Sequence, residues 1–427
     1  METKTAAIEM RNITKRFGPV LANDKVWLNI YRGEILALLG ENGSGKTTLM
    51  NMLSGIYFPD EGEIKIDGKE VVIRSPKDAF DNGIGMIHQH FKLVDVLTAA
   101  ENIVLGLPGK LDLKAASAKI REICDKYGFS VDPAQKIYDM SVSQKQTVEI
   151  VKVLYRGADI LILDEPTAVL TPQETDKLFA VLRNMRNDGK AIVIITHKMH
   201  EVEALSDRVA ILRHGQFIGD MLTAHTNAQE MTNMMVGHAV SLNIERPDPV
   251  DPKPRIEVKG LTVRSVDGIV KLDDVSFTAN SGEILGIAGI SGCGQKELLE
   301  AIAGLQTVES GSISYIEDDG SREELIGKDP LSIAELGVSL SFVPEDRLGM
   351  GLVGNMNLAD NMMLRSFRRG KSIFTDRRSP RALAESVVQE LSVSTPSVDT
   401  PVRRLSGGNV QKVLVGREIA SAPTVLL

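Results

Sequence analysis

Short apolar runs separated by amphipathic stretches dominate the first half of the chain. The runs Ile35–Leu39, Ile160–Leu163 and Ala191–Ile195 have the length and β-branched content of strands that are buried on both faces. The stretches Pro172–Arg186 and Lys198–Leu205 carry apolar residues at helical spacing. Strands that alternate with helices predict an α/β fold, in which helices pack on the faces of a parallel sheet.

The pattern occurs twice along the sequence. The segment Gly33–Gly40 recurs as Gly282–Gly289, 249 residues later. Met140-Ser141 aligns with Leu405-Ser406 at a distance of 265 residues, so the second copy has gained residues in between. Two copies of one domain explain the 427 residues better than three unrelated domains do.

A proline-rich connector separates the two copies. Four prolines alternate with charged residues between 245 and 254, and this stretch has no apolar face to bury. We therefore predict a first domain at residues 1–244, a linker at 245–254 and a second domain at 255–427.

Composition narrows the class of protein. Lys and Arg number 49 and Asp and Glu 57, which gives a net charge of −8 and argues against a nucleic-acid binder. The two cysteines, Cys124 and Cys293, exclude a disulfide scaffold and fit a reducing cytosol. No apolar run reaches the roughly 18 residues that span a bilayer, and the first residues lack the layout of a secretory signal. We expect any contact with a membrane to go through a partner.

A phosphate-binding loop follows the first predicted strand. The eight residues that match GxxxxGK[ST] before a predicted helix are Gly40, Glu41, Asn42, Gly43, Ser44, Gly45, Lys46 and Thr47. Glycines let several backbone N–H groups face one anion, and the helix directs its N-terminus at it. Lys46 is expected to neutralise phosphate oxygens, and the Thr47 hydroxyl to bind Mg²⁺. The alternative is a glycine-rich turn that binds nothing.

Two carboxylates and a histidine complete the candidate chemistry. Asp164 and Glu165 end an apolar strand, where Asp164 suits the outer coordination sphere of Mg²⁺ and Glu165 suits polarising the attacking water. His197 follows another predicted strand, and ligands of α/β sheets bind at the carboxyl ends of strands. Solvated acids and a structural histidine are the alternative interpretation.

Together these residues resemble the ATP-binding cassette family, over nearly the whole chain. The resemblance implies two tandem P-loop domains, each with a RecA-like parallel core, an antiparallel β subdomain and a helical subdomain. It assigns Phe17 to adenine stacking, Asp164 to the metal, Glu165 to the catalytic base and His197 to the switch histidine. It also gives Gln89 a place beside the γ-phosphate, the metal and the membrane subunit. The nucleotide contacts implied in the first copy run from Gly40 to Thr48.

The second copy carries the family's signature loop. The signature residues implied to contact nucleotide are Ser406, Gly407, Gly408 and Asn409. The first copy has Ser143 where the signature has glycine, and its loop is therefore altered. The alternative is that Ser143 is a harmless variant that leaves the function of the loop unchanged.

The second phosphate loop is degenerate. Gln295 stands where the first copy has Lys46, and Lys296 stands where it has Thr47. Val266 and Glu345 take the places of Phe17 and Gln89. In this family the phosphate loop of one copy faces the signature of the other. The changes therefore predict one hydrolytic site and one degenerate, regulatory site.

The second copy also ends early relative to the first. The position that corresponds to Asp164 would be 429, and Leu427 is the last residue. We therefore expect a second domain without its own metal-binding acid, catalytic base and switch histidine. Either the sequence is part of a longer protein or the natural chain is defective.

Two cassettes joined by a short linker resemble the ATPase subunits that serve importers of simple sugars, and residues 88–103 look closest to the nucleoside-importing branch. The resemblance implies ATP and Mg²⁺ as cofactors, and permease subunits and a solute-binding protein as partners. It places the chain at the cytoplasmic face of the cell membrane. A non-hydrolytic nucleotide-binding fragment and a soluble tandem cassette acting on ribosomes are the alternatives.

Overall fold

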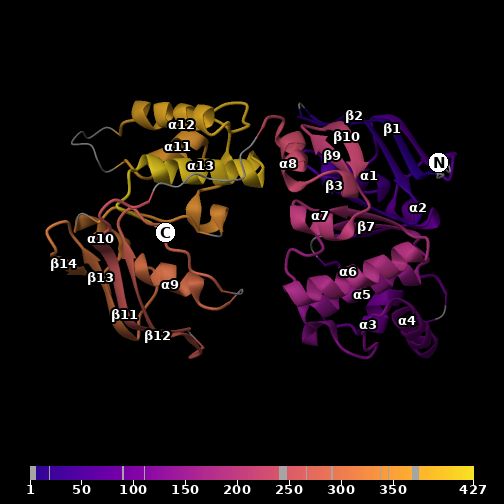
Figure 1. Cartoon of the computed structure of the whole chain (residues 1–427), viewed down its shortest axis with the longest axis horizontal. Coiled ribbons are helices and arrows are strands. Elements are labelled where there is room, and N and C mark those ends of the chain that lie inside the picture. Colours follow the sequence, from indigo (N-terminus) through magenta and orange to yellow (C-terminus); the bar gives the residue numbers. More distant parts are fainter. Residues whose placement is uncertain are drawn as a thin grey trace. The chain divides into compact units, whose positions relative to one another are not determined.

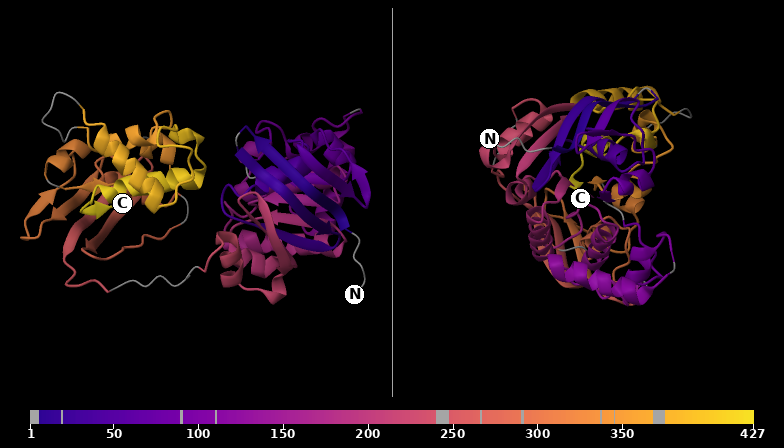
Figure 2. Two further views of the ribbon diagram at one scale, coloured as in Figure 1. Left: turned by 90° about the horizontal axis from the view of Figure 1, so that it is seen from above. Right: turned by 90° about the vertical axis from the view of Figure 1, so that its right-hand side faces the viewer.

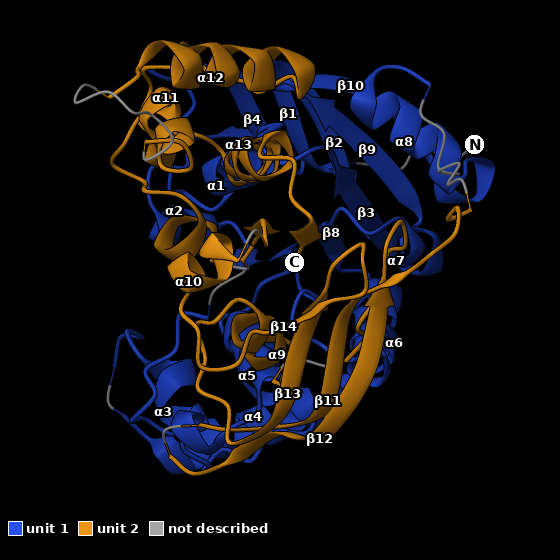
Figure 3. Cartoon of the chain, turned by 90° about the vertical axis from the view of Figure 1, so that its left-hand side faces the viewer, with its two compact units in different colours: residues 1–244 blue, residues 245–427 orange. Residues whose placement is uncertain are grey.

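The computed structural model describes residues 6–18, 20–88, 91–109, 111–239, 248–265, 267–289, 292–336, 338–344, 346–367 and 375–427 (Figure 1). The chain divides into two compact units, residues 1–244 and residues 245–427, which Figure 3 shows in blue and orange. Residues 245–247 of the predicted linker lie outside the described ranges. Residues 248–253 form neither helix nor strand.

A six-stranded sheet is the centre of unit 1, with the strand order β10-β9-β3-β8-β7-β6. Neighbouring strands pair in parallel, except for β10, which runs antiparallel to β9 at one edge. The strands are β3 (Glu34–Leu39), β6 (Ile84–Ile87), β7 (Ile160–Asp164), β8 (Ala191–Ile195), β9 (Arg208–Arg213) and β10 (Gln216–Leu222). The three strands predicted from the apolar runs are confirmed as β3, β7 and β8.

An antiparallel sheet with the order β2-β1-β4-β5 forms the second layer of unit 1. Its strands are β1 (Ala6–Phe17), β2 (Val20–Tyr31), β4 (Glu61–Ile66) and β5 (Lys69–Val71), and the long pair β1 and β2 appears in indigo in Figure 2. Alternate residues of the central strands enter different apolar clusters. Leu36 and Leu38 pack with residues of β1 and β2, whereas Ile35 packs in a separate cluster with residues of the helices. Every residue of β3 is buried for this reason.

The helices of unit 1 include both predicted helical stretches, each to within one residue of its predicted bounds. They are α1 (Lys46–Leu53), α2 (Pro76–Asp81), α3 (Ala99–Val104), α4 (Leu113–Tyr127), α5 (Val142–Tyr155), α6 (Pro172–Asn187), α7 (Met199–Leu205) and α8 (Ala228–Val236), with 3-10 turns at Ile137–Asp139 and Thr223–His225. A capping box between Thr171 and Glu174 fixes the start of α6. Helices α3, α4 and α5 share an apolar cluster of their own, which is the predicted helical subdomain.

Unit 2 repeats part of this plan. Its antiparallel sheet has the order β12-β11-β13-β14, and β15 pairs in parallel with β16. The strands are β11 (Pro254–Arg264), β12 (Val270–Asn280), β13 (Ser310–Ile316), β14 (Arg322–Glu324), β15 (Leu340–Ser341) and β16 (Val425–Leu426). The helices are α9 (Gln295–Ile302), α10 (Pro330–Glu335), α11 (Leu358–Met363), α12 (Arg378–Glu390) and α13 (Gly407–Ala420), with short helical turns at Arg347–Gly351 and Val402–Arg404.

The repeat of β3 is not a strand in unit 2. Residues 283–289 match β3 in sequence, yet they form no strand, and Ile284 is 80% exposed. In unit 1, β3 lies between β8 and β9. Among the described residues of unit 2, no strand pairs with this segment. A buried strand needs partners on both edges for its backbone groups, so an apolar sequence alone does not make it form.

Within the described part of the chain, no helix has both the length and the apolar character that crossing a bilayer requires.

Arg208, at the start of β9, ties the two sheets of unit 1 together. Its guanidinium donates to Oε1 of Glu34 in β3 at 2.9 Å and to the carbonyl oxygen of Asn29 in β2 at 2.6 Å. It also pairs with Asp220 in β10. Arg208 and Glu34 are only 7% and 6% exposed, so each depends on the other for compensation of a buried charge.

Removing this cation is expected to destabilise unit 1 strongly. Arg208→Met keeps the apolar stem but leaves Glu34 buried without its guanidinium, at a cost of about 3–5 kcal/mol in the free energy of unfolding. Urea denaturation of the full chain measures this cost. Arg32→Met breaks the exposed Arg32–Asp67 pair and is the matched control, with an expected cost of about 0–1 kcal/mol. Equal costs for the two variants would contradict the role of Arg208.

Candidate nucleotide site

Residues 40–45 form a tight loop between the end of β3 and the start of α1. Gly45, the N-cap of α1, has a φ of 94°. A Cβ at this position would lie 2.3 Å from the carbonyl oxygen of Ala22 and 2.7 Å from Nδ2 of Asn23. Only glycine combines this left-handed backbone with so close an approach of a neighbouring strand.

Two observations fit this loop to the phosphates of a nucleotide. Helix α1 begins without a side-chain cap, so its first N–H groups are available to an anion. The Oγ atom of Ser44 is buried and has no hydrogen-bond partner among the described residues. A buried hydroxyl of this kind is satisfied by a ligand oxygen.

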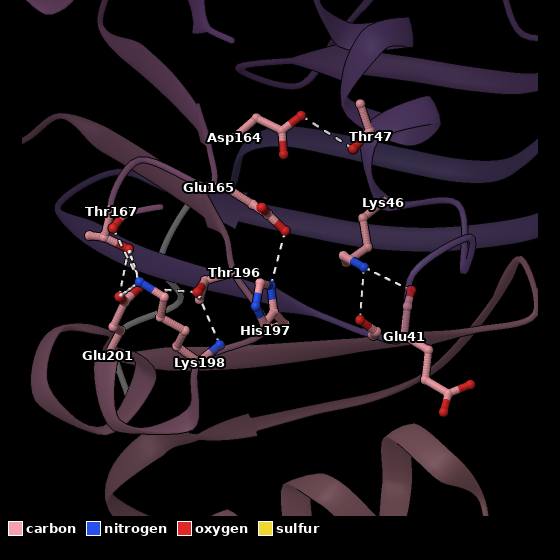
Figure 4. A network of polar contacts seen from close by, with 11 residues as sticks. Glu41, Lys46, Thr47, Asp164, Glu165, Thr167, Thr196, His197, Lys198 and Glu201 are labelled. Atoms are coloured by element: carbon pink, nitrogen blue, oxygen red, sulfur yellow. Dashed lines mark hydrogen bonds and ion pairs between the residues drawn. The ribbon is translucent and has the colours of Figure 1, made fainter. Parts of the chain in front are cut away.

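Lys46 is the first residue of α1 and is only 7% exposed. Its ammonium donates to the carbonyl oxygens of Gly40 at 2.7 Å and Glu41 at 2.9 Å (Figure 4). Burial lowers the pKa of Lys46, and the carboxylates of Glu165, Asp164 and Glu41 oppose that change. The ammonium is thus held by weak neutral acceptors, which a phosphate oxygen can replace with a charge-assisted bond.

Thr47 and Asp164 meet across the loop. The Thr47 hydroxyl donates to Oδ2 of Asp164 at 3.2 Å. Asp164 is buried at the carboxyl end of β7, and burial raises its pKa, while the hydrogen bond from Thr47 lowers it and the charge of Glu165 raises it. A hydroxyl beside a carboxylate offers the hard oxygen ligands that Mg²⁺ prefers.

Glu165 and His197 form the second contact of the site. Nδ1 of His197 lies 3.0 Å from Oε1 of Glu165. Glu165 has a φ of 47°, an uncommon backbone conformation for this residue type. Its N–H still donates to the carbonyl oxygen of Ile195 at 2.9 Å, which continues the pairing of β7 with β8 by one residue. The ladder holds the strained residue in place, as is typical of functional positions.

The structure therefore brings the phosphate loop, both carboxylates and the histidine to the carboxyl ends of β3, β7 and β8. Figure 4 shows Lys46, Thr47, Asp164, Glu165 and His197 around one region. Gln89, which the resemblance assigns to the same region, lies outside the described residues.

In the corresponding loop of unit 2, the described glycines keep their backbone angles, but glutamine replaces the lysine. Gly292 and Gly294 have φ values of 84° and 96°, close to the 84° and 94° of Gly43 and Gly45. Gln295 occupies the first helical position, and Lys296 is exposed and pairs with Glu300 at 3.8 Å. No buried cation of the described loop takes the place of Lys46. Ile290, Ser291, Val266 and Glu345 lie outside the described residues.

The signature-equivalent helix of unit 1 caps itself. Ser141 precedes α5, and its Oγ accepts the N–H of Gln144 at 3.3 Å. Oε1 of Gln144 in turn accepts the N–H of Ser141 at 2.8 Å. This capping box satisfies the helix start internally and leaves less for an anion to bind.

The signature helix of unit 2 starts differently. Ser406 precedes α13 and makes no side-chain cap to its backbone. Asn409, which stands where unit 1 has Gln144, is shorter by one methylene and instead donates from Nδ2 to Oγ of Ser406 at 2.9 Å. Its Oδ1 accepts the N–H of Ser394 at 2.9 Å. The first amide groups of α13 therefore have no side-chain cap within the described residues, which suits an anion.

Comparison with known proteins identifies the family. Residues 23–168 and 272–427 each match the ABC transporter family. The chain belongs to this family. It is 44% identical to the nucleoside import ATP-binding protein NupA of Lactococcus lactis, over 98% of this chain and 83% of that protein. It is 42% identical to the guanosine import ATP-binding protein NupO of Bacillus subtilis, over 98% and 82% of the two chains. It is also 40% identical to the glucose import ATP-binding protein TsgD13 of Haloferax volcanii, over 100% and 83%.

Aromatic residues of this ABC transporter chain gather near the end of β1. Phe17 is 41% exposed, and its ring contacts that of Tyr57 edge to face at 5.1 Å between centroids. The Lys15 ammonium lies 5.6 Å from the centre of the Phe17 ring. An exposed ring held in this way can stack on a base.

Sequence reasoning missed two polar groups and one aromatic. Tyr57 was missed because it belongs to no motif, although it follows α1 and the phosphate loop by a few residues. Gln146, which donates from Nε2 to the carbonyl oxygen of Pro166 at 2.5 Å, and Glu201 were missed because they lie far in sequence from the loop they contact. The helical pattern identifies Gln146 and Glu201 only as polar residues of helices and gives no sign of their partners.

Gly45→Ala is expected to damage nucleotide binding. Strain at a left-handed φ costs about 1–2 kcal/mol, and the Ala22 carbonyl must also move, so the affinity for ATP falls by about tenfold or more. Binding of a fluorescent ATP analogue to the full chain measures this. Gly68→Ala is the matched control, because Gly68 has a φ of 78° with nothing within 4 Å of the added carbon. Unchanged affinity for Gly45→Ala would exclude the predicted role of this loop.

Proposed function

We propose that this ABC transporter chain is the ATP-hydrolysing subunit of an importer and energises uptake of a nucleoside or a simple sugar. It works at the cytoplasmic face of the cell membrane, with permease subunits and a solute-binding protein as partners. The observation that carries the proposal is the grouping of Lys46, Thr47, Asp164, Glu165 and His197 around one phosphate loop. The names of the relatives, all import ATP-binding proteins, support the direction of transport.

Each side chain of the site has a task in phosphoryl transfer. The N-terminus of α1 and Lys46 bind the phosphates of ATP and neutralise their charge. Thr47 and Asp164 would hold Mg²⁺, which supplies further neutralisation of β- and γ-phosphate oxygens when bound. Glu165 orients the attacking water and accepts its proton. His197, 3.0 Å from Glu165, keeps that carboxylate in position.

The two units contribute unequally. We infer one hydrolytic site, formed by the phosphate loop of unit 1 and the signature loop of unit 2, Ser406 to Asn409. The uncapped start of α13 and the retained cation Lys46 support this assignment. The self-capped start of α5 and the substituted Gln295 support a second, degenerate site that does not hydrolyse ATP.

A nucleoside is the first candidate for the solute. The relatives from Lactococcus lactis and Bacillus subtilis, named for nucleoside and guanosine import, are 44% and 42% identical to the chain. A glucose import relative follows at 40%. The small difference keeps a simple sugar as the second candidate. Uptake of radiolabelled guanosine and ribose by cells that lack or carry the chain distinguishes the two.

Glu165→Gln tests the hydrolytic assignment. Loss of the proton acceptor is expected to lower steady ATP turnover by about 100-fold or more, while binding of ATP is retained because the phosphate loop is intact. Phosphate release by the full chain measures turnover. Glu122→Gln, an exposed residue of α4, is the control for loss of one carboxylate. If wild type and Glu165→Gln show only the same background turnover, the non-hydrolytic nucleotide-binding alternative replaces the proposed function.

A pair of reciprocal substitutions tests the asymmetry. Gly408→Ser copies into unit 2 the residue that unit 1 has at Ser143, and the added carbon meets nothing within 4 Å in the chain itself. The fold is therefore retained, whereas the approach of a phosphate is blocked, and turnover is expected to fall by about tenfold. Ser143→Gly is expected to leave turnover unchanged, because Gln295 still replaces the cation. A rise in turnover for Ser143→Gly would contradict the degenerate assignment.

A further inference from the structure

A buried polar network lies behind the catalytic pair. Thr167 follows Glu165 by two residues, and Thr196 directly precedes His197. Between them lies Glu201, in the first turn of α7. Thr167, Thr196 and Glu201 are only 2%, 3% and 4% exposed. None of them belongs to the phosphate loop, and their side-chain hydrogen bonds within the described residues go to one another and to Lys198, so the chemistry proposed above does not explain their burial.

The carboxylate of Glu201 joins two segments of the chain. Its Oε1 accepts the hydroxyl of Thr167 at 2.5 Å, and its Oε2 accepts the hydroxyl of Thr196 at 3.1 Å (Figure 4). One oxygen thus holds the loop after the catalytic base and the other holds the residue before the switch histidine. Hydrogen bonds to a charged acceptor are the stronger kind and fix geometry well.

Lys198 balances the buried charge. Its Nζ lies 3.0 Å from Oε1 of Glu201 and donates to the carbonyl oxygen of Thr167 at 3.1 Å and to its hydroxyl at 3.2 Å. His197 is therefore flanked on both sides by residues that contact the carboxylate. Movement of the 196–198 segment away from Thr167 breaks several bonds at once and leaves a carboxylate buried without partners, which is costly.

Helix capping does not account for Glu201. A glutamate at the third position of a helix commonly reaches back to the N-cap N–H. In α7 the N-cap is Lys198, and its N–H donates instead to Oγ1 of Thr196 at 3.1 Å. The carboxylate is directed across to Thr167 rather than back along its own helix. Its hydrogen bonds connect the segment that contains Thr167 with the segment that contains Thr196.

We propose that Glu201 is a positioning residue for ATP hydrolysis, which sets the separation of Glu165 and His197 through Thr167 and Thr196. This inference rests on the proposed function. The carboxylate does not touch ATP; it holds the two segments so that the 3.0 Å contact between Oε1 of Glu165 and Nδ1 of His197 forms. Because the phosphate loop is untouched, loss of Glu201 changes the chemical step and not the binding of ATP.

Glu201→Gln in the full chain is the main test. The amide keeps the size of the side chain but supplies only one acceptor oxygen, so one of the two threonines loses its acceptor. The expected result is a fall in kcat of about 10- to 100-fold, the range for a misplaced catalytic group, with the KM for ATP unchanged within about twofold. Glu203→Gln, the same change on an exposed residue of the same helix, is expected to leave both constants at the wild-type values. A raised KM with unchanged kcat, or no change in either, overturns the proposal.

Thr167 provides an independent test if Glu201→Gln fails to fold, as judged by thermal denaturation. Thr167→Val removes the hydroxyl and nearly preserves the volume, and is expected to lower kcat with KM unchanged. Thr167→Ser restores the hydroxyl and is expected to restore kcat, which a packing role alone does not require. Equal kcat values for the Val and Ser variants overturn the proposal. Wild-type turnover no greater than that of Glu165→Gln would instead remove the proposed function, and this inference with it.

Discussion

Parallel pairing of β8 with β3 on one side and with β7 on the other is the constraint on which the site depends. The carboxyl ends of parallel strands meet at one edge of the sheet. β3 therefore delivers the phosphate loop, β7 delivers Asp164 and Glu165, and β8 delivers His197 to the same place. The register of these pairs is fixed because alternate residues fill different apolar clusters on the two faces of the sheet. The catalytic geometry is thus specified by residues that take no part in the chemistry.

Much of this arrangement could be predicted from the sequence, for reasons that are local. Buried parallel strands have continuous apolar runs, so β3, β7 and β8 were recognisable without any contact information. The glycines and Lys46 of the phosphate loop could be recognised because only that spacing produces the loop. Glu165 and His197 could be expected at one edge once parallel strands were assumed.

The remaining features depend on contacts distant in sequence. Nothing near Glu201 in the sequence indicates that its carboxylate meets Thr167, 34 residues earlier. The exposed state of residues 283–289 contradicts what their apolar sequence predicts, because a strand is stable only with neighbours that the sequence of the strand does not contain. The self-capping of α5 likewise depends on one methylene, by which Gln144 reaches an amide that Asn409 does not.

Helices α5 and α13, which follow the two signature loops, differ in stability because only α5 has a side-chain cap. A side-chain cap stabilises a helix by about 1 kcal/mol, so α5 possesses a stabilising interaction that α13 lacks. A helix start that stays open for a ligand therefore lowers the free energy of unfolding by about 1 kcal/mol, and a side-chain cap raises it again. Under the proposed asymmetry, α5 belongs to the degenerate site although it lies in unit 1, so its start need not stay open for a ligand. Opening the start of α5 would therefore lower the stability of unit 1 by about 1 kcal/mol.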